Sequence, residues 1–371
     1  MDNERYSGYA RFLESLSGEA RLRSIPPQRD GMRLVDLCSN DYMGLARRQE
    51  KFERPSGSYT SSASRLLSFR QLSHSRLEER LASLYGRPAL CFNSGYHANV
   101  GIVAALNIPD TLFVADKLVH ASMIDGLMAG RCAFKRFPHN DIAALDAILA
   151  RESGNHRQIV VMAESIYSMD GDKAPLAELV ALREKYPDVL LYIDEAHAFG
   201  VRGRQGLGLC EETGVIDSVD IIVGTLGKAA ASMGAFCIAD RCLTDFLINT
   251  SRSFIFSTAL PPAVMEWSLT MVDALADMAE EREHLKRISR LFRTQLGLPD
   301  GDTPIVPLLT GSADKALELS RRLADKGIMA LPIRRPTVPP GGERIRFSLN
   351  ASMSEDYTLT VAGIIKETMQ K

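Results

Sequence analysis

The sequence lacks the long apolar stretches and the charge imbalance that mark several classes of protein. No segment of its 371 residues approaches the ~18 continuous apolar residues of a membrane-spanning helix. The first residues, Met1 to Arg5, are charged and lead into no apolar run, so we expect no secretory signal. The formal net charge of −2 gives no general attraction to nucleic acid or anionic lipid. We therefore expect no nucleic-acid or membrane partner, and any anion-binding site must be local.

The sequence also lacks paired cysteines. Its six cysteines are scattered, no two form a C-x-x-C pair, and most lie in apolar segments. This pattern favours reduced thiols over disulfides or a zinc site, so we expect a cytoplasmic protein without a bound metal. The cysteines are Cys38, Cys91, Cys132, Cys210, Cys237 and Cys242.

Internal repeats and low-complexity segments are absent, and 371 residues are more than one hydrophobic core usually organises. Apolar residues make up 45% of the chain and charged residues 24%, which is typical of a globular protein. We predict three parts: an N-terminal arm and small segment at 1–50, a large domain at 51–262, and an interdomain helix with a small α/β domain at 263–371.

The pattern of apolar residues predicts an α/β fold. Short apolar strands alternate with helix-length segments from about residue 73 to 260, which is typical of a mostly parallel sheet with helices on both faces. Expected strands are 34–37, 89–92, 111–114, 158–162, 189–193, 221–223, 305–309, 329–333 and 344–349. Expected helices are an amphipathic one from 1 to about 30, then 75–85, 96–106, one long helix over 264–296, 313–326, and a final helix.

Ligands of such sheets bind beyond the carboxyl ends of the strands, so the residues after each strand are the candidates for chemistry. Asp194 follows the apolar strand 189–193, where a poorly solvated carboxylate needs a positive partner or caps a helix. Lys228 follows the strand 221–223 behind Gly224, Thr225 and Gly227. Desolvation there lowers the pKa of a lysine and makes its amine nucleophilic, although a surface lysine on a glycine-rich turn is the plainer alternative.

A third strand end is the turn Phe92-Asn93-Ser94-Gly95-Tyr96, where a helix begins. Backbone N–H groups at a helix start suit a phosphate, but taken alone this signal is weak. Together the three strand ends meet the needs of pyridoxal 5'-phosphate: an amine for the aldehyde (Lys228), a carboxylate for the pyridine nitrogen (Asp194), and a phosphate cradle made by Gly95, Tyr96 and Thr225.

The runs Asp194-Glu195-Ala196-His197 and Gly224-Thr225-Leu226-Gly227-Lys228 resemble those of fold-type-I pyridoxal-phosphate enzymes, and more narrowly those of the α-oxoamine synthases. Further matches appear in the family's order over roughly residues 33 to 350. They are Asn40 to Leu45, Ser94 to Asn99, His120-Ala121-Ser122, Ser168 to Asp172, and Phe254 to Pro262. The resemblance implies an aspartate-aminotransferase-like transferase fold, with a large cofactor-binding domain and a small C-terminal α/β domain. It also implies decarboxylative joining of an amino acid to an acyl thioester.

The resemblance implies roles for the residues around the cofactor. Lys228 forms the Schiff base and acts as general base and acid at the amino-acid Cα. Asp194 keeps the pyridine nitrogen protonated, and His197 hydrogen-bonds the phenolic oxygen of the ring. His120 stacks on the ring and contacts substrate. The remaining cofactor contacts implied are Ser168, the cradle of Gly95, Tyr96 and Thr225, and Ser257 or Thr258, which reach the phosphate of the partner subunit in a homodimer.

For the substrate, the resemblance implies Asn40 and Arg346 as carboxylate binders and Thr337 as part of a substrate-contact loop. A planar guanidinium suits a bidentate carboxylate, whereas an exposed strand arginine is the alternative for Arg346. Arg21 or Arg23 matches an arginine that some members use for the acyl chain, and Arg23 is our candidate.

Two loops depart from the family pattern. The run Thr60-Ser61-Ser62-Ala63-Ser64-Arg65 replaces a glycine-rich run, and Gly234-Ala235, preceded by Ala229 to Met233, replaces a glycine pair. Both loops lie near the substrate in this family, so the substrates are less firmly predicted than the cofactor.

Within the family, Phe254 to Pro262 is most similar to the acyltransferases of biotin biosynthesis, which condense L-alanine with a pimeloyl thioester to 8-amino-7-oxononanoate, carbon dioxide and free thiol. The acyl donor is either a coenzyme A thioester or a carrier-protein thioester. Members of the 5-aminolevulinate synthase, 2-amino-3-ketobutyrate ligase and serine palmitoyltransferase types remain alternatives. So does a non-catalytic cofactor-binding module, against which stands the intact set of lysine, aspartate and histidine.

Overall fold

The computed structural model describes residues 4–25, 34–69 and 71–370. Its centre is a seven-stranded sheet in the order β2-β8-β7-β6-β5-β3-β4. Every neighbouring pair from β7 to β4 is parallel, and β8 runs antiparallel to both of its neighbours. The strands are β2 (Ala89–Phe92), β3 (Thr111–Asp116), β4 (Ala133–Phe137), β5 (Gln158–Glu164), β6 (Val189–Asp194), β7 (Ile221–Thr225) and β8 (Ala235–Ala239). The predicted mostly parallel sheet is confirmed.

Helices cover both faces of this sheet, because successive strand residues point to opposite faces and both sets are apolar. One face packs against α3 (Gly95–Ala105), α4 (Ala121–Ala129), α8 (Arg241–Thr250) and α9 (Arg252–Ile255). The other packs against α2 (Leu72–Tyr85), α5 (Ile142–Glu152), α6 (Leu176–Lys185) and α10 (Pro262–Ala276). Short helices lie at Leu45–Arg47, Gln49–Lys51, α7 (Leu209–Glu212) and Ile216–Ser218. Each strand except the edge strand β4 is therefore buried on two sides, which explains the continuous apolar runs.

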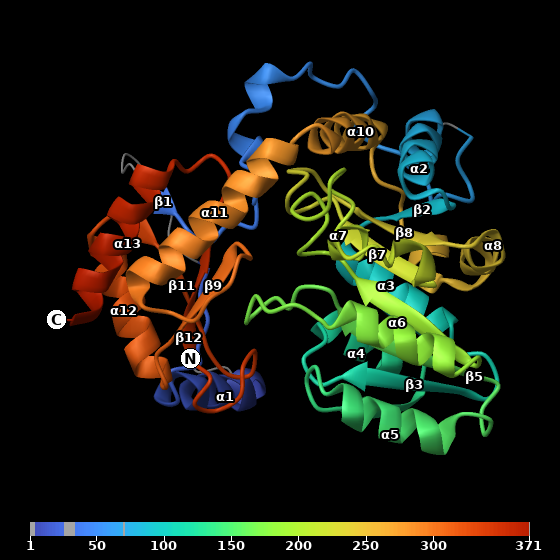
Figure 1. Ribbon diagram of the computed structural model, residues 1–371, viewed down its shortest axis with the longest axis horizontal. Coiled ribbons are helices and arrows are strands. Elements are labelled where there is room, and N and C mark those ends of the chain that lie inside the picture. Colours follow the sequence, from blue (N-terminus) through green and yellow to red (C-terminus); the bar gives the residue numbers. More distant parts are fainter. Residues whose placement is uncertain (1–3, 26–33, 70, 371) are drawn as a thin grey trace.

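The C-terminal part contains a three-stranded antiparallel sheet in the order β11-β12-β9. Its elements are α11 (Ala279–Leu296), β9 (Ile305–Leu309), α12 (Ala313–Asp325), β10 (Ile328–Met329), β11 (Leu331–Ile333), β12 (Arg344–Ser348) and α13 (Glu355–Gln370). The N-terminal strand β1 (Val35–Asp36) pairs with β10, so the start of the chain packs with its end. In Figure 1, α10 and α11 run from the large sheet to this smaller part. The predicted boundaries after residues 50 and 262 stay predictions.

Three sequence expectations need correction. The N-terminal helix is short: a 3₁₀ turn at Glu4–Tyr6 leads into α1 (Ser7–Gly18), and Ala20 adopts a left-handed φ of 54° that ends it. The predicted end of this helix, at about residue 30, lies outside the described residues. The predicted strand 329–333 divides at Ala330, because β10 pairs with β1 whereas β11 pairs with β12.

The predicted single helix over 264–296 is two helices, α10 and α11, separated at Asp277 and Met278. The buried Arg282 stabilises the break, since its guanidinium donates to the carbonyl of Leu275 at 2.5 Å and satisfies a C-terminal carbonyl of α10. Glu280 and Glu281 in the first turn of α11 favour a new helix start there.

Two strands were absent from the sequence prediction. Four of the five residues of the edge strand β4 are exposed, so its pattern is not apolar. The other, β8, is fully buried but follows the turn after Lys228 directly, without a helix between. No helix in the described ranges is both long and apolar enough to cross a membrane. All six cysteines are free.

Candidate active site

The carboxyl ends of three neighbouring strands gather the predicted catalytic residues. In the central sheet β5, β6 and β7 are adjacent and parallel, and Glu164 at the end of β5 pairs in register with Asp194 at the end of β6. The segments that follow β6 and β7 contain His197 and Lys228, which therefore lie at the same edge. The loop after β5 extends from this edge toward β9 and β12 (Figure 1).

A row of polar contacts leads outward from the lysine. Lys228 Nζ lies 2.9 Å from His197 Nε2, and His197 Nδ1 lies 2.7 Å from Tyr42 Oη. Burial lowers the pKa of Lys228 to about 8 and holds the pKa of the buried His197 well below its usual range. A neutral, nucleophilic amine is thus available at Lys228 near neutral pH, and the neutral imidazole beside it can donate from one nitrogen and accept at the other.

Asp194 is buried and fixed by two donors. The backbone N–H of Ala196 donates to its Oδ1 at 2.8 Å, and the side-chain amide of Asn99 donates to its Oδ2 at 2.8 Å. Asn99 is itself oriented, because its Oδ1 accepts from the hydroxyl of Tyr192 at 2.6 Å. The carboxylate is therefore held in one orientation. A carboxylate that binds a cationic ring nitrogen needs to be fixed in this way.

The same amide connects Asp194 to His120. Asn99 donates to Ser122 Oγ at 2.9 Å, and Ser122 Oγ lies 2.7 Å from His120 Nδ1. The backbone N–H of Ser122 also donates to this Nδ1, which puts the proton of the neutral imidazole on Nε2. The ring of His120 is exposed at the edge of the site. Its place is compatible with the predicted stacking on a cofactor ring.

The predicted phosphate cradle lies at the start of α3. Ser94 caps this helix by accepting from the backbone N–H of His97 at 3.2 Å. Within the described part of the chain, no group accepts a hydrogen bond from the backbone N–H of Gly95 or Tyr96. The side chain of Thr225 lies close to Gly95, since a Cβ added to that glycine would be 3.8 Å from Thr225 Oγ1. Free N–H donors, a helix start and a hydroxyl suit a phosphate.

Three further predicted contacts lie around this centre. The backbone carbonyl of Ser168 accepts from Arg346 Nε at 2.6 Å. The backbone carbonyl of Thr258 accepts from the side chain of Asn93 at 2.7 Å, which places the segment of Ser257 and Thr258 beside the start of α3. Thr258 is exposed and Ser257 half-buried. Both hydroxyls are therefore at the surface near the phosphate cradle.

Arg346 lies close to the other predicted carboxylate binder. Its Nη1 donates to Asn40 Oδ1 at 3.1 Å and to Ser348 Oγ at 2.8 Å, and its Nη2 donates to Tyr42 Oη at 3.2 Å. Arg346 is 7% exposed, so the alternative of an exposed strand arginine is wrong. Since Tyr42 also contacts His197, the arginine is joined to the lysine by consecutive polar contacts.

The two candidate N-terminal arginines occupy different places. Arg21 forms an ion pair with Glu19 at 2.7 Å. Arg23 donates to Thr337 Oγ1 at 2.8 Å. Thr337 and Ser168 line one cavity of about 460 Å³, together with Leu118, Val119, Met169, Val338 and Pro339. The structure thus brings Arg23, rather than Arg21, to the predicted substrate-contact loop.

Three residues of the site were missed as site residues by sequence reasoning. Tyr42 and Asn99 occur in the matched runs, but only the fold reveals their contacts to His197 and Asp194. Glu164 is 2% exposed beside Asp194, and its Oε1 has no hydrogen-bond partner among the described groups. Burial, with the neighbouring Asp194, raises the pKa of Glu164 well above its usual range, which favours the neutral form of this carboxyl. The sequence feature that could have identified Glu164 is its position at the end of an apolar strand.

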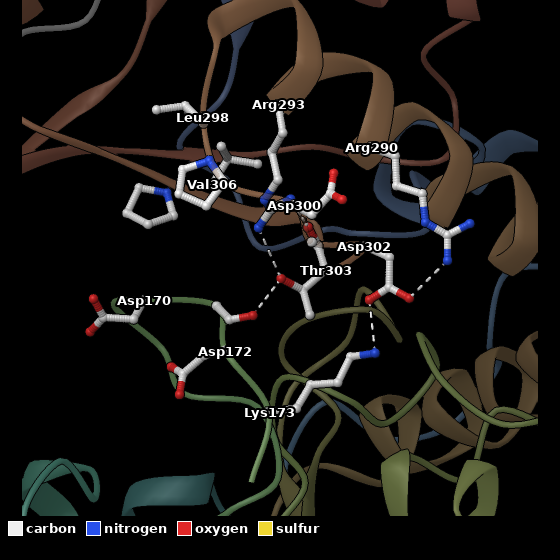
Figure 2. Close-up of a pocket in the computed structure, with 14 residues that line it drawn as sticks. Asp170, Asp172, Lys173, Arg290, Arg293, Leu298, Asp300, Asp302, Thr303 and Val306 are labelled. Carbon is white, nitrogen blue, oxygen red and sulfur yellow. Dashed lines mark hydrogen bonds and ion pairs between the residues drawn. The ribbon is translucent and has the colours of Figure 1, made fainter. Parts of the chain in front are cut away.

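A larger cavity of about 670 Å³ lies between the loop at 170–173 and the C-terminal part, and it contains none of the predicted catalytic residues. Figure 2 shows Asp302 between Lys173 and Arg290, at 2.8 and 3.3 Å, and Thr303 beside Arg293. Thr303 donates to the carbonyl of Gly171 at 2.5 Å. These contacts attach the loop of Ser168 to the C-terminal part of the chain.

Comparison with known proteins places the chain among named enzymes. Residues 33–365 match the family model of aminotransferase class I and II. A putative 8-amino-7-oxononanoate synthase of Pasteurella multocida is 44% identical over 367 residues, covering 93% of this chain and 95% of the relative. An 8-amino-7-oxononanoate synthase of Haemophilus ducreyi is 45% identical over 342 residues, covering 87% of this chain and 88% of the relative.

Solved structures agree with this placement. A serine palmitoyltransferase from S. paucimobilis with a bound PLP–myriocin aldimine is 27% identical with a TM-score of 0.87, covering 100% of this chain and 98% of that one. An 8-amino-7-oxononanoate synthase from Francisella tularensis is 25% identical with a TM-score of 0.74, covering 91% of this chain and 98% of that one. The predicted fold class is confirmed.

Proposed function

Because the chain belongs to the aminotransferase class I and II family, we propose that it is a pyridoxal-phosphate-dependent acyltransferase of the 8-amino-7-oxononanoate synthase type. It condenses L-alanine with a pimeloyl thioester and releases 8-amino-7-oxononanoate, carbon dioxide and free thiol, a step of biotin biosynthesis. The observation that supports this most is the row of contacts from Lys228 through His197 and Tyr42 to Arg346. It places an amine for the cofactor and a guanidinium for a carboxylate at one site.

The residues present fit pyridoxal 5'-phosphate. Lys228 is the covalent anchor, Asp194 holds the pyridine nitrogen, and His197 bonds the phenolic oxygen. His120 covers a ring face, Ser168 makes a further contact, and the N–H groups of Gly95 and Tyr96 with Thr225 hold the phosphate. The bound cofactor supplies an electron sink that stabilises negative charge at the amino-acid Cα. Asp194 supports this role because Asn99 and Ala196 fix the orientation of its carboxylate.

The chain's own groups bind the amino acid and move its proton. Arg346 and Asn40 bind the alanine carboxylate until it leaves as carbon dioxide, and the charge-assisted contact orients the substrate. Lys228 takes the α-proton at Nζ and later returns a proton to the same carbon. Its pKa of about 8 suits both tasks near neutral pH, because a general base works best when its pKa is close to the operating pH.

For the acyl chain we propose the cavity bounded by Thr337 and Ser168, with Arg23 at the terminal carboxylate. The apolar lining of Val119, Met169 and Val338 suits methylene groups, and the guanidinium bonded to Thr337 suits the distal carboxylate. Both coenzyme A and an acyl carrier protein remain possible carriers.

We also propose a homodimer in the cytoplasm, with Ser257 or Thr258 completing the phosphate site of the partner subunit. Large apolar side chains are exposed near this segment, among them Leu67 at 76%, Phe69 at 106% and Phe256 at 70%. Large apolar side chains exposed to this degree favour association.

An assay for product with three amino acids and several acyl thioesters tests the proposal. Alanine with pimeloyl thioester should give the highest kcat/KM among alanine, glycine and serine combined with acetyl, succinyl, pimeloyl and palmitoyl donors. A higher value for serine with palmitoyl donor would favour the second candidate, a serine palmitoyltransferase, which the similarity in fold supports. A higher value for glycine would favour the 5-aminolevulinate synthase or 2-amino-3-ketobutyrate ligase type.

A further inference from the structure

The turn that begins at Lys228 contains an unusual backbone conformation. The N–H of Ala231 donates to the carbonyl of Lys228 at 2.9 Å, which closes a turn with Ala229 and Ala230 buried inside it. Ala231 has a φ of 44°, in the left-handed region that residues with a Cβ rarely adopt. Such a conformation persists only when surrounding contacts hold it.

Helix α10 provides those contacts with two successive residues. The indole N–H of Trp267 donates to the carbonyl of Ala231 at 3.1 Å. Ser268 Oγ lies 2.8 Å from Ser232 Oγ. Ser268 already donates its proton to the carbonyl of Val264, so Ser232 is the donor in this second contact. The helix thus binds two consecutive residues of the turn.

Packing also fixes the indole. The ring of Phe52 meets Trp267 edge-on, with ring centres 6.0 Å apart and an interplanar angle of 90°. Trp267 is the only tryptophan of the chain, and a cavity of about 860 Å³ lies beside it and Ala231. The turn borders this cavity, and the indole bond joins it to α10 there.

We propose that Trp267 is a positioning residue for Lys228: its indole N–H holds Ala231 in the left-handed conformation and thereby fixes Lys228 Nζ beside His197. This inference rests on the proposed function only in its test by kcat, because kcat can be measured only with the proposed substrates. When the bond from the indole N–H is lost, Ala231 relaxes toward negative φ. The conformation of the turn then changes, and Lys228, its first residue, moves with it.

The first test is Trp267→Phe in the cofactor-loaded enzyme, which removes the donor and keeps an aromatic ring. We expect kcat to fall on the order of three- to tenfold, as for one neutral hydrogen bond. KM for alanine should change less than about twofold, because no contact of Asn40 or Arg346 is altered. The pH midpoint of the visible absorption of the bound cofactor should shift, since the lysine environment changes.

The decisive test is rescue by Ala231→Gly. Glycine adopts positive φ without strain, so adding it to Trp267→Phe should restore most of the lost kcat and the original pH midpoint. Ala231→Gly alone should resemble the wild type. Phe52→Leu is the matched control, because it removes the ring contact but keeps the indole N–H, and it should shift the pH midpoint less than Trp267→Phe does.

Three outcomes would overturn the proposal: Trp267→Phe without effect, a loss that Ala231→Gly does not restore, or an equal shift of the midpoint in Phe52→Leu. If no amino acid and thioester pair gives product, the proposed function fails. The pH midpoint of the absorption, and its rescue by Ala231→Gly, still decide the role of Trp267, because these measurements need only the bound cofactor.

Discussion

Replacing Arg346 by alanine should weaken binding of the amino-acid substrate and leave binding of the cofactor largely intact. Arg346 is buried on β12 and donates to Asn40 and Tyr42, and Tyr42 in turn contacts His197. Under the proposed function, the two η nitrogens also face the substrate carboxylate. A planar donor pair of this kind binds carboxylates in bidentate fashion.

The magnitude follows from the kind of bond that is lost. Hydrogen bonds to charged groups contribute about 1.5–3 kcal/mol, so the dissociation constant of alanine should rise roughly 13- to 160-fold. Removing Arg346 also takes one donor from Asn40 Oδ1 and from the carbonyl of Ser168, a loss that lowers the stability of the protein with or without alanine. Arg346→Lys keeps the charge but has a single donor group, so its dissociation constant for alanine should lie between those of the wild type and Arg346→Ala.

The assay is titration of the cofactor-loaded enzyme with alanine, without an acyl donor, followed by the change in absorption. Titration with ethylamine, which is alanine without its carboxylate, separates the two explanations. Arg346→Ala should weaken alanine and leave ethylamine within about twofold. An equal loss for both ligands would refute carboxylate binding and would show that Arg346 acts by holding Tyr42 and Ser168.

The matched control is Arg344→Ala. Arg344 is also buried on β12, but its guanidinium donates to Asp170, to the carbonyl of Met169 at 3.2 Å and to that of Gly342 at 2.7 Å, away from Asn40 and Tyr42. Its loss should lower the free energy of unfolding and leave the affinity for alanine unchanged. A loss of alanine affinity as large as that of Arg346→Ala would show that the effect is general.

Four further predictions follow from the site. Borohydride should fix the cofactor to Lys228, and the rate of cofactor addition to the apoprotein should rise with pH around a midpoint of about 8, because burial lowers the pKa of this amine; a midpoint near 10 or label on another lysine contradicts it. Asp194→Asn should slow exchange of the alanine α-hydrogen in deuterated water on the order of 100-fold or more, and unchanged exchange refutes the electron-sink role. Although burial lowers the pKa of His139, its hydrogen bonds to Asp116 and Asp172 raise the pKa to about 10, so the protonated imidazole stabilises the fold fully below about pH 6.5 and no longer does so once the pH has risen through about 10. His139→Gln should therefore lower the free energy of unfolding by about 1–2 kcal/mol at pH 6 and by less at pH 10.5. An equal loss at both pH values contradicts the ion pairs. Mixed dimers of Lys228→Ala and Thr258→Ala should regain part of the activity, whereas an active monomer in sedimentation ends the dimer proposal.

The central sheet could be predicted because its strands are buried on two faces. The run at 89–92 in this sheet is apolar, short and bounded by turn residues, as is the run at 305–309 in the C-terminal sheet, and the structure gives both the same limits. The edge strand β4 has no such pattern, since Lys135 and Arg136 are exposed to solvent. The division of the predicted helix at Asp277 depends on Arg282, whose bond to α10 is a tertiary contact that periodicity does not report.

The grouping of Asp194, His197 and Lys228 at one edge of the sheet could be predicted in the same way, and the contacts around them could not. Asp194 and Lys228 stand directly after apolar strands, so the residue types and the strand ends were sufficient. Tyr42 and Asn99 act through side-chain contacts across 155 and 95 residues of sequence, and only the folded chain reveals these. The choice between Arg21 and Arg23 likewise needed the contact to Thr337, which lies 314 residues away.

The protonation state of Lys228 and the hydrogen bonds of Tyr42 are connected through His197. A neutral imidazole has one N–H, and its two nitrogens face Lys228 Nζ and Tyr42 Oη. When the lysine is protonated it donates to Nε2, so the imidazole proton is on Nδ1 and the hydroxyl of Tyr42 turns to Asn40 Oδ1, 3.1 Å away. When the amine is neutral, Nε2 can donate and the hydroxyl turns back to Nδ1. Asn40 and Tyr42 both accept from Arg346, so the charge at Lys228 changes the groups that surround Arg346.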